Sequence, residues 1–371
     1  MTPINLAVGY PAIAALSALN HRPVAGLAAH DFSTPGPFAG IAELREAIVQ
    51  RQVERHGLHW SADELIVTNG ATEAIALPLQ NLLRAGEEVL LPLPSWNHFG
   101  QLMDWENIRY RTFDTSAATQ FQPTAAQLAE EIKPRTRLLV LTNPGNPGGG
   151  VLGRAEMEAI AELVRAHPRL LVVADEVYEL QAFGRPFVSF ASLPGMANRT
   201  ITLHGFSKSF GLTAWRVGWL HVPSEHYEDL LYRHRLLTYG VPPAGQYVAL
   251  AALRAESEYR ALWADYIPGN QAFLAGALNQ VDGITASVPP GAYFVLADGR
   301  RLLHQRRQTP SSFTQQLQAA QQLQIRDASE EGLPGWFRIN AAQERSVLEA
   351  AVQRLWSYVE DSVDPPDRGD L

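Results

Sequence analysis

Short apolar runs that alternate with helical patterns constrain the fold of this chain more than any other feature. The runs are continuous and rich in Val, Ile and Leu, and they cover residues 65–68, 89–91, 138–142, 170–175, 200–204 and 217–222. Helical patterns are found at 71–83 and 154–167. Such runs are typical of parallel strands buried on both faces, and their alternation with helices predicts an α/β fold with a mostly parallel sheet flanked by helices.

The chain length predicts a second lobe. With 371 residues, the chain exceeds the size at which one hydrophobic core stops growing. After about residue 256, helical stretches surround only two short strand-like pieces, at 292–296 and 336–339. We expect a large cofactor-binding domain at 31–255, a smaller α+β domain made of 1–30 and 256–362, and a disordered tail at 363–371.

Composition excludes several classes of function. An apolar share of 46% and a charged share of 18% are typical of a globular enzyme. A net charge of −8 without a long basic run argues against nucleic acid and membranes as partners. The absence of cysteine excludes thiolate chemistry, and the scattered histidines favour no metal site. Neither a signal sequence nor an apolar stretch of membrane-spanning length is found, so we expect a cytoplasmic protein.

Polar residues follow three of the expected strands. Asn143 and Asp175 lie at the ends of two apolar runs, and Lys208 lies shortly after a third. In open α/β sheets, ligands bind in the crevice at the carboxyl ends of the strands. The pattern therefore predicts that these three residues share one crevice.

The segment around Lys208 suits a lysine that attacks a carbonyl. Lys208 and Lys133 are the only lysines of the chain. Serines flank Lys208, Gly211 follows, and Arg216 lies further on. A Schiff-base lysine needs a partly desolvated or cation-flanked amine, small neighbours let a flat ring approach, and an arginine offers a planar charged fork to phosphate.

This segment resembles the pyridoxal-phosphate attachment site of the class I/II aminotransferase family. The family pattern is a small residue, an apolar residue, Ser, Lys, two variable residues, Gly, an apolar residue, three further positions and Arg, and residues 205–216 meet every position. The resemblance implies the fold type I architecture of PLP-dependent transferases, pyridoxal 5′-phosphate (PLP) as cofactor, and a Schiff base on Lys208. Gly205 stands where the family often has Ser, so one phosphate hydroxyl is absent, while Ser207 is a candidate cofactor-binding residue.

Asp175 and Tyr178 resemble two further residues of the family site. The matching aspartate binds the protonated pyridine nitrogen, which lets the ring accept the electrons of a Cα carbanion. A carboxylate at a strand end is costly unless it faces a cation, although an aspartate there also suits a helix N-cap. Tyr178 matches the tyrosine whose hydroxyl donates to the phenolate oxygen. Lys208, Asp175 and Tyr178 are thus the candidate catalytic residues.

The stretch 143–150 resembles the family's Asn-Pro-x-Asn-Pro-Thr/Ser-Gly loop. Asn146 matches the asparagine that offers its amide to the phenolate oxygen. Gly148 stands where the family usually has Thr or Ser, so a side-chain hydroxyl is absent. Asn-Pro and Pro-Gly pairs also form turns without any function.

The stretch 70–74 follows a strand and opens a helix, in a position that resembles the family's phosphate site. Exposed amides and the positive end of the helix dipole attract a phosphate there. Ala71 would act through its N–H, Thr72 through its N–H and hydroxyl, and Arg216 would complete the site. An ordinary helix start is the alternative.

Four residues complete the resemblance. Trp96 matches the aromatic residue that stacks on the cofactor ring, although a core tryptophan has the same signature. Arg338 matches the small-domain arginine that grips the substrate α-carboxylate, with a salt bridge on a strand edge as the alternative. Gly9 and Tyr10 lie in a Gly-Tyr-Pro segment similar to the one that closes over the substrate.

One departure concerns the stretch 31–39. Many relatives carry a tyrosine there that reaches the phosphate bound by the partner subunit, and this chain has none around Phe32. The resemblance implies a homodimer with active sites at its interface, and the missing tyrosine predicts an altered phosphate contact across it.

The resemblance extends from Gly9 to Arg338 with its motifs in family order, and it implies an aminotransferase that acts between an α-amino acid and a 2-keto acid. Elimination, replacement or cyclisation of a functionalised amino acid on the same cofactor stays open, because these reactions share their first steps. A PLP-sensing regulator is disfavoured because the family pattern starts at about Ile4 and leaves no room for a DNA-binding segment. A dehydrogenase is disfavoured because no G-x-G-x-x-G follows the first strand.

Overall fold

The chain folds into two compact units. The computed structural model describes residues 2–361 of the chain. The larger unit contains residues 14–264 and 290–292, and the smaller unit contains 2–13, 265–289 and 293–361. Helix α10 (Glu256–Leu278) begins in the larger unit and ends in the smaller one. The expected tail at 363–371 lies outside the described residues.

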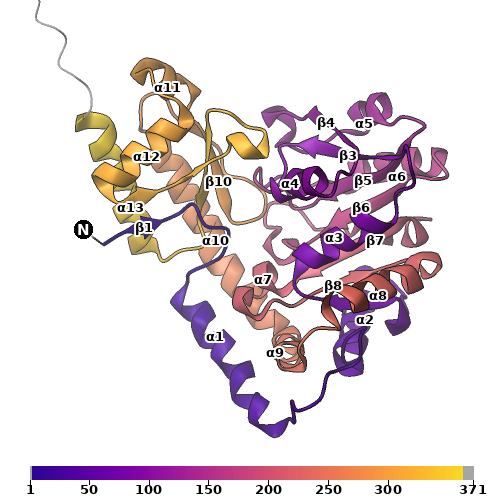
Figure 1. The fold of residues 1–371 in the computed structure, drawn as a ribbon. Helices are drawn as coiled ribbons and strands as arrows, with labels where there is room; N and C mark the ends of the chain where they lie inside the picture. Colours follow the sequence, from indigo (N-terminus) through magenta and orange to yellow (C-terminus); the bar gives the residue numbers. More distant parts are fainter. Residues whose placement is uncertain (1, 362–371) are drawn as a thin grey trace, which may run out of the picture. The chain divides into compact units, whose positions relative to one another are not determined.

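A seven-stranded sheet forms the centre of the larger unit (Figure 1). In spatial order its strands are β2 (Leu65–Thr68), β8 (Gly218–His221), β7 (Thr200–Gly205), β6 (Leu171–Asp175), β5 (Thr136–Thr142), β3 (Glu88–Leu93) and β4 (Tyr110–Asp114). Strands β4, β3, β5, β6 and β7 pair in parallel. All residues of β6 and β7 are buried, as expected for strands covered on both faces. The predicted mostly parallel sheet is therefore confirmed.

Strand β8 runs against its neighbours, so the prediction of a parallel strand at 217–222 is wrong. It pairs antiparallel with both β7 and β2. The connection from β7 to β8 contains only the four-residue helix α7 (Phe206–Ser209) and a 3-10 turn at Thr213–Trp215. A parallel strand needs a crossover, usually a helix that packs across the sheet, and this connection contains no such helix. The short connection instead turns the chain back and holds Lys208 between two neighbouring strands.

Amphipathic helices cover the sheet of the larger unit. Helix α6 buries Met157, Ile160, Ala161 and Val164, which recur along one helix face. These side chains form one cluster with apolar residues of β5 and β6. The helices of this unit, besides α7 and the first part of α10, are α1 (Ala14–Ala25), α2 (Ala42–His56), α3 (Ala71–Asn81), α4 (His98–Trp105), α5 (Ala125–Glu131), α6 (Arg154–Ala166), α8 (Ser224–Thr238) and α9 (Pro243–Arg254).

The smaller unit has its own sheets and its own core. Its antiparallel sheet has the order β12 (Arg326–Asp327), β13 (Trp336–Asn340), β10 (Phe294–Asp298) and β9 (Thr285–Ala286). Strand β1 (Ile4–Asn5) pairs in parallel with β11 (Leu323–Gln324). Four helices add apolar residues to one buried cluster: α10, α11 (Arg300–Arg306), α12 (Pro310–Gln321) and α13 (Arg345–Asp361). Within residues 2–361, no helix combines the length and the apolar character that a membrane crossing requires.

Candidate active site

The carboxyl ends of three neighbouring parallel strands bring Asn143, Asp175 and Lys208 to one edge of the sheet. Thr142 at the end of β5 is paired with Asp175 at the end of β6, and Asp175 is paired with Leu203 of β7. The Asn143 N–H donates to the Asp175 carbonyl at 3.0 Å. Lys208 follows in α7, directly after β7 ends. The structure thus brings together the three residues that the strand pattern singled out.

Asp175 is a buried carboxylate. Its exposed fraction is 4%, and the Val177 N–H donates to Oδ1 at 3.3 Å. Burial raises the pKa of Asp175 to about 7, and the hydrogen bond and the positive charge of Lys208 offset this only in part. A carboxylate in such a place gains most from a cation that a ligand brings.

Side chains from other segments fix the backbone around Lys208. Gln181 Nε2 donates to the Lys208 carbonyl at 3.3 Å. The Ser209 hydroxyl donates to the Val177 carbonyl at 2.9 Å, and Trp263 Nε1 donates to the Ser209 carbonyl at 2.7 Å. Lys208 itself is only partly buried. Gln181 gave no signal in the sequence, because its role depends on a contact that only the fold creates.

A cationic cradle lies at the start of α3. Gly70, with φ of +77°, is the N-cap residue of this helix. The Arg216 guanidinium lies over this glycine, since a Cβ on Gly70 would come within 2.6 Å of Arg216 Nη2. Arg216 Nη1 also donates to Ser207 Oγ at 3.3 Å. Amides at a helix start, hydroxyl groups and a guanidinium are donors that suit a phosphate, and Ala71 and Thr72 are the first two residues of the helix.

Glycines let the strands approach this helix start. Gly205 and Gly218 face each other across β7 and β8. A Cβ on Gly218 would lie 2.7 Å from Ala71 N, and a Cβ on Gly205 would lie 3.2 Å from Ala71 Cβ. Gly205 therefore brings β7 close to the first turn of α3, at the cost of the hydroxyl that a serine would supply.

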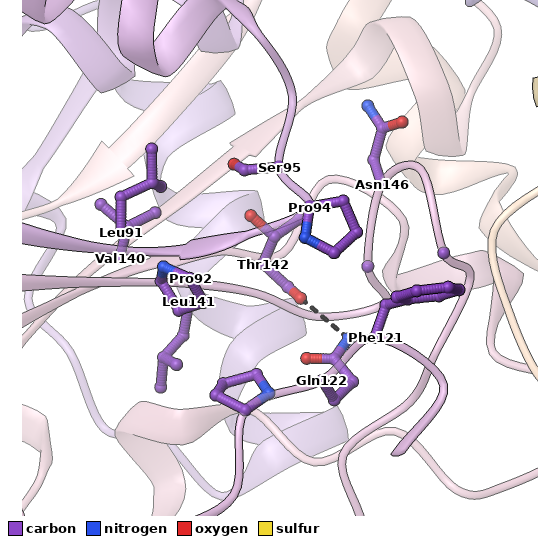
Figure 2. Close-up of a pocket in the computed structure, with 13 residues that line it drawn as sticks. Leu91, Pro92, Pro94, Ser95, Phe121, Gln122, Val140, Leu141, Thr142 and Asn146 are labelled. Carbon is purple, nitrogen blue, oxygen red and sulfur yellow. Dashed lines mark hydrogen bonds between the residues drawn. The ribbon is translucent and has the colours of Figure 1, made fainter. Parts of the chain in front are cut away.

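The 143–150 loop carries Asn146 to a small pocket (Figure 2). Pro94, Ser95 and Phe121 also line this pocket, whose volume of about 20 Å³ is enough for one water molecule. Gly148, the departure from the family loop, has a steric cause. A Cβ on Gly148 would come within 2.9 Å of Phe121 Cβ, so Thr or Ser fits only if the neighbouring loop moves.

Trp96 lies between β3 and α4 and is only partly buried. Its ring centroid is 4.7 Å from that of His98 and 6.3 Å from that of Phe99. Burial lowers the pKa of His98, which favours a neutral imidazole. A partly exposed tryptophan fits a stacking surface better than a place in the core.

Arg338 lies in the smaller unit on β13, which is a central strand and not an edge. Its exposed fraction is 6%. Nη2 donates to the Ala7 carbonyl at 3.1 Å, and the guanidinium carbon lies 4.4 Å from the centroid of the Phe294 ring. Nη1 is 3.9 Å from Oε1 of the buried Glu331. These surroundings disfavour the alternative of a surface salt bridge.

The segment with Gly9 and Tyr10 is tied to the same part of the smaller unit. The Tyr293 hydroxyl donates to the Gly9 carbonyl at 3.0 Å, and Asn340 Nδ2 donates to the Tyr10 carbonyl at 2.7 Å. The Tyr10 side chain is about half exposed. The structure thus places Gly9, Tyr10 and Arg338 together.

An ion network beside Tyr178 had no sequence signal. The next residue, Glu179, is buried and lies within 3.0 Å of Arg51, Arg55 and His56 on α2. Burial opposes its charge, but Arg51 and His56 outweigh this and hold the pKa of Glu179 well below its usual range. The network anchors the segment that carries Asp175 and Tyr178, through partners more than 100 residues away in the chain.

Known proteins resemble the chain over most of its length. The family description "Aminotransferase class I and II" matches residues 3–355. The bifunctional aspartate aminotransferase and glutamate/aspartate-prephenate aminotransferase of Petunia hybrida is 34% identical over 266 residues, which cover 71% of this chain and 56% of that protein. The aspartate aminotransferase of Pinus pinaster is 33% identical over 302 residues, which cover 74% of this chain and 61% of that protein. The chain thus spans less than two thirds of these two relatives.

A solved structure extends the likeness to the fold. The aspartate aminotransferase of Rhizobium meliloti superposes with a TM-score of 0.88 at 25% identity, covering 96% of this chain and 91% of that one. The predicted fold type I architecture is thereby confirmed. With a family match over nearly the whole chain, the protein belongs to the class I and II aminotransferase family.

Proposed function

We propose that this protein is a PLP-dependent aminotransferase that moves an amino group between an α-amino acid and a 2-keto acid. Class I and II aminotransferases use PLP, and the family match supports amino-group transfer. One observation carries the proposal. Lys208 and the buried Asp175 lie at the same sheet edge, in the unit that also contains the Arg216 cradle.

The larger unit offers groups that fit each end of the cofactor. Asp175 would face the ring nitrogen, where a pyridinium cation would relieve its buried charge. Arg216, Ser207 and the N–H groups of Ala71 and Thr72 would hold the phosphate, with the Thr72 hydroxyl as a further donor. When bound, PLP supplies an electron sink for bonds at the substrate Cα.

The other candidate residues of the larger unit would act at the cofactor ring and at the substrate. The Tyr178 hydroxyl and the Asn146 amide would donate to the phenolic oxygen, and the Trp96 ring would cover one face. Lys208 would remove the proton from the substrate Cα and return it to the C4′ carbon of the cofactor. Acid–base help of this kind contributes roughly 10²–10⁴-fold to the rate.

The smaller unit would hold the substrate carboxylate. The Arg338 guanidinium offers a planar fork that matches a carboxylate. Its contacts with Ala7 and Phe294 fix the orientation of that fork. Gly9 would let the carboxylate approach the backbone, and Tyr10 would border the substrate side chain.

Aspartate is the first amino donor to test, because both plant relatives carry the name of aspartate aminotransferase. Elimination, replacement or cyclisation of a functionalised amino acid is the second candidate, because it would use the same lysine, aspartate and arginine. The products separate the two.

We also propose a homodimer. Helix α8 and the residue after it present large apolar side chains that are half exposed or more, a pattern typical of surfaces that bind a partner. These side chains are Tyr232, Leu236, Leu237 and Tyr239. The cytoplasm as the location stays a prediction of the sequence.

The test of the lysine uses a control within the chain. Borohydride reduction of the PLP-loaded protein should fix the cofactor on the peptide with Lys208 and leave the peptide with Lys133 unmodified. Lys208→Ala should lower turnover by at least roughly 10³-fold, whereas Lys133→Ala should retain it. Cofactor on Lys133, or full activity of Lys208→Ala, would reject the proposal.

The test of the reaction uses a panel of amino acids that begins with aspartate. Mass spectrometry should detect the 2-keto acid of the best substrate, together with the aminated cofactor. A product that has lost or rearranged its side chain would instead identify an elimination, replacement or cyclisation enzyme.

A further inference from the structure

We propose that the loop at 116–122 is a clamp that positions Asn146, with Gln122 as the positioning residue. Phe121 takes the space that a hydroxyl-bearing side chain would need at Gly148. The inference rests on the proposed function, because Asn146 matters for catalysis only if it contacts the cofactor. It adds residues that no motif of the family marks in this chain.

Gln122 closes the 143–150 loop at both ends. It is 5% exposed. Its Nε2 donates to the Thr142 carbonyl at 3.2 Å, a hydrogen bond that is marked in Figure 2, and to the Gly150 carbonyl at 2.8 Å. The first acceptor precedes the loop and the second ends it. A Cβ on Gly145 would lie 2.7 Å from the same nitrogen, so the amide also fills the inside of the loop. A single side-chain donor therefore fixes the span on which Asn146 lies.

The clamp is itself fixed from within. The Thr119 hydroxyl donates to the Gln122 carbonyl at 2.7 Å. Gln120 and Phe121 have φ values of +54° and +58°, which residues with a side chain rarely adopt. Two consecutive residues in this region indicate that the surrounding contacts hold the backbone there.

The contact between the two loops leaves no room for larger residues. A Cβ on Gly148 would come within 2.9 Å of Phe121 Cβ and 3.1 Å of the Gln120 carbonyl oxygen. A Cβ on Gly150 would come within 2.3 Å of the same oxygen. Gly148 is thus matched to the conformation of the 116–122 loop, and the missing hydroxyl is the consequence.

This packing gives Asn146 a defined place before any ligand binds. Within the loop, the Gly145 N–H donates to the Gly150 carbonyl at 2.8 Å, and the Gly149 N–H donates to the Gly145 carbonyl at 2.9 Å. These bonds depend on the ends that Gln122 holds. An amide that donates to a cofactor oxygen loses the hydrogen bond when it is misplaced by about 1 Å.

The first experiment compares Gln122→Leu with Gln127→Leu. Gln127 caps α5, where its Oε1 accepts from the Thr124 N–H at 3.1 Å, so its loss removes a similar bond without touching the 143–150 loop. We expect Gln122→Leu, but not Gln127→Leu, to speed amide hydrogen exchange of residues 143–150 by about tenfold in the cofactor-free protein. We also expect about tenfold weaker PLP binding and a shifted pH dependence of the absorbance of the lysine-bound cofactor.

Exchange in the cofactor-free protein does not depend on the reaction, so it separates this inference from the proposed function. Unchanged exchange in Gln122→Leu overturns the clamp even if the protein is an active aminotransferase. Faster exchange with unchanged PLP binding and absorbance overturns the link to Asn146.

The second experiment is a double-mutant cycle on Phe121 and Gly148. Gly148→Ser should reduce PLP affinity about tenfold and lower the unfolding temperature in the otherwise unchanged chain, because the new Cβ meets Phe121. In a Phe121→Gly background, Gly148→Ser should reduce the PLP affinity and the unfolding temperature clearly less. Equal reductions in both backgrounds would contradict the steric match between Phe121 and Gly148.

Discussion

Asp175 in the larger unit and Arg338 in the smaller unit are both buried charges, but their surroundings differ. Burial raises the pKa of Asp175 to about 7, although Lys208 partly offsets it. Arg338 has the Glu331 carboxylate at 3.9 Å, the Phe294 ring at 4.4 Å and the Ala7 carbonyl at 3.1 Å. The first charge is poorly compensated by the protein, and the second is well compensated.

This difference determines how much each buried charge gains when a ligand of opposite charge binds. A poorly compensated carboxylate binds a ligand cation with a gain in stability, because its own burial cost is relieved. A compensated guanidinium gains less from a ligand carboxylate, because a protein carboxylate already lies close. Removing the carboxylate charge of Asp175 in the larger unit should therefore weaken ligand binding, whereas removing that of Glu331 in the smaller unit should strengthen it.

Among the changes that test this contrast between the two units, Asp175→Asn should give the largest effect. Asparagine keeps the shape but cannot carry the charge that would face the ring nitrogen. Loss of one partner of a buried ion pair costs about 3–5 kcal/mol, so kcat should fall by roughly 10²–10⁴-fold. Steady-state kinetics with saturating PLP measures this. Asp104→Asn is the matched control, since that carboxylate accepts from Tyr110 at the surface. A near-normal kcat in Asp175→Asn would contradict the view that the poorly compensated charge of Asp175 acts on the cofactor.

The same substitution should stabilise the cofactor-free protein at high pH. The folded-state pKa of about 7 lies above the ordinary aspartate value of 3.8, so the stability that this group contributes is fully present below pH 3.8 and is lost as pH rises through 7. The shift corresponds to roughly 4 kcal/mol at most. In urea unfolding without cofactor, Asp175→Asn should therefore have a higher free energy of unfolding than the unchanged protein at pH 8, and the difference should be smaller at pH 5. A difference that increases toward pH 5 would contradict the raised pKa of Asp175.

The sequence predicted the central sheet of the larger unit well because local patterns determine its strands. Apolar runs marked the strands, and the ends of parallel strands must meet at one edge, so Asn143, Asp175 and Lys208 could be placed together. The direction of β8 was missed, because a run of apolar residues does not show which way a strand runs. Motifs of the family supplied the remaining candidate residues.

The partners of these residues could not be predicted. Gln122, Gln181 and Glu331 are polar residues without a motif, and each acts on a group that the fold brings near it. A polar residue in a loop looks the same in sequence whether it is solvated or buried. Only the burial and the hydrogen bonds of the folded chain separate the two cases.

Arg338→Lys should give an intermediate effect confined to the substrate. Lysine keeps the charge but loses the planar fork and the stacking on Phe294. The KM for the amino acid and for the keto acid should rise by roughly 10–100-fold, with kcat and PLP affinity nearly unchanged. Arg301→Lys is the control, because its pair with Asp282 is exposed. Weaker PLP binding in Arg338→Lys would break the division of roles between the units.

Glu331→Gln should give the smallest effect, and of the opposite sign to Asp175→Asn. Burial raises the pKa of Glu331, although Arg338 and Arg326 oppose this, so its charge is held at a cost. Glutamine keeps an oxygen that can accept from Arg326 Nε, now at 3.1 Å from Glu331 Oε1, and removes the negative charge near Arg338. A substrate carboxylate then has less competition for the guanidinium, and KM should fall by about threefold with kcat unchanged. If KM rises instead, Glu331 acts mainly by orienting Arg338. The carboxylate that compensates Arg338 would then be required for substrate binding and would not weaken it.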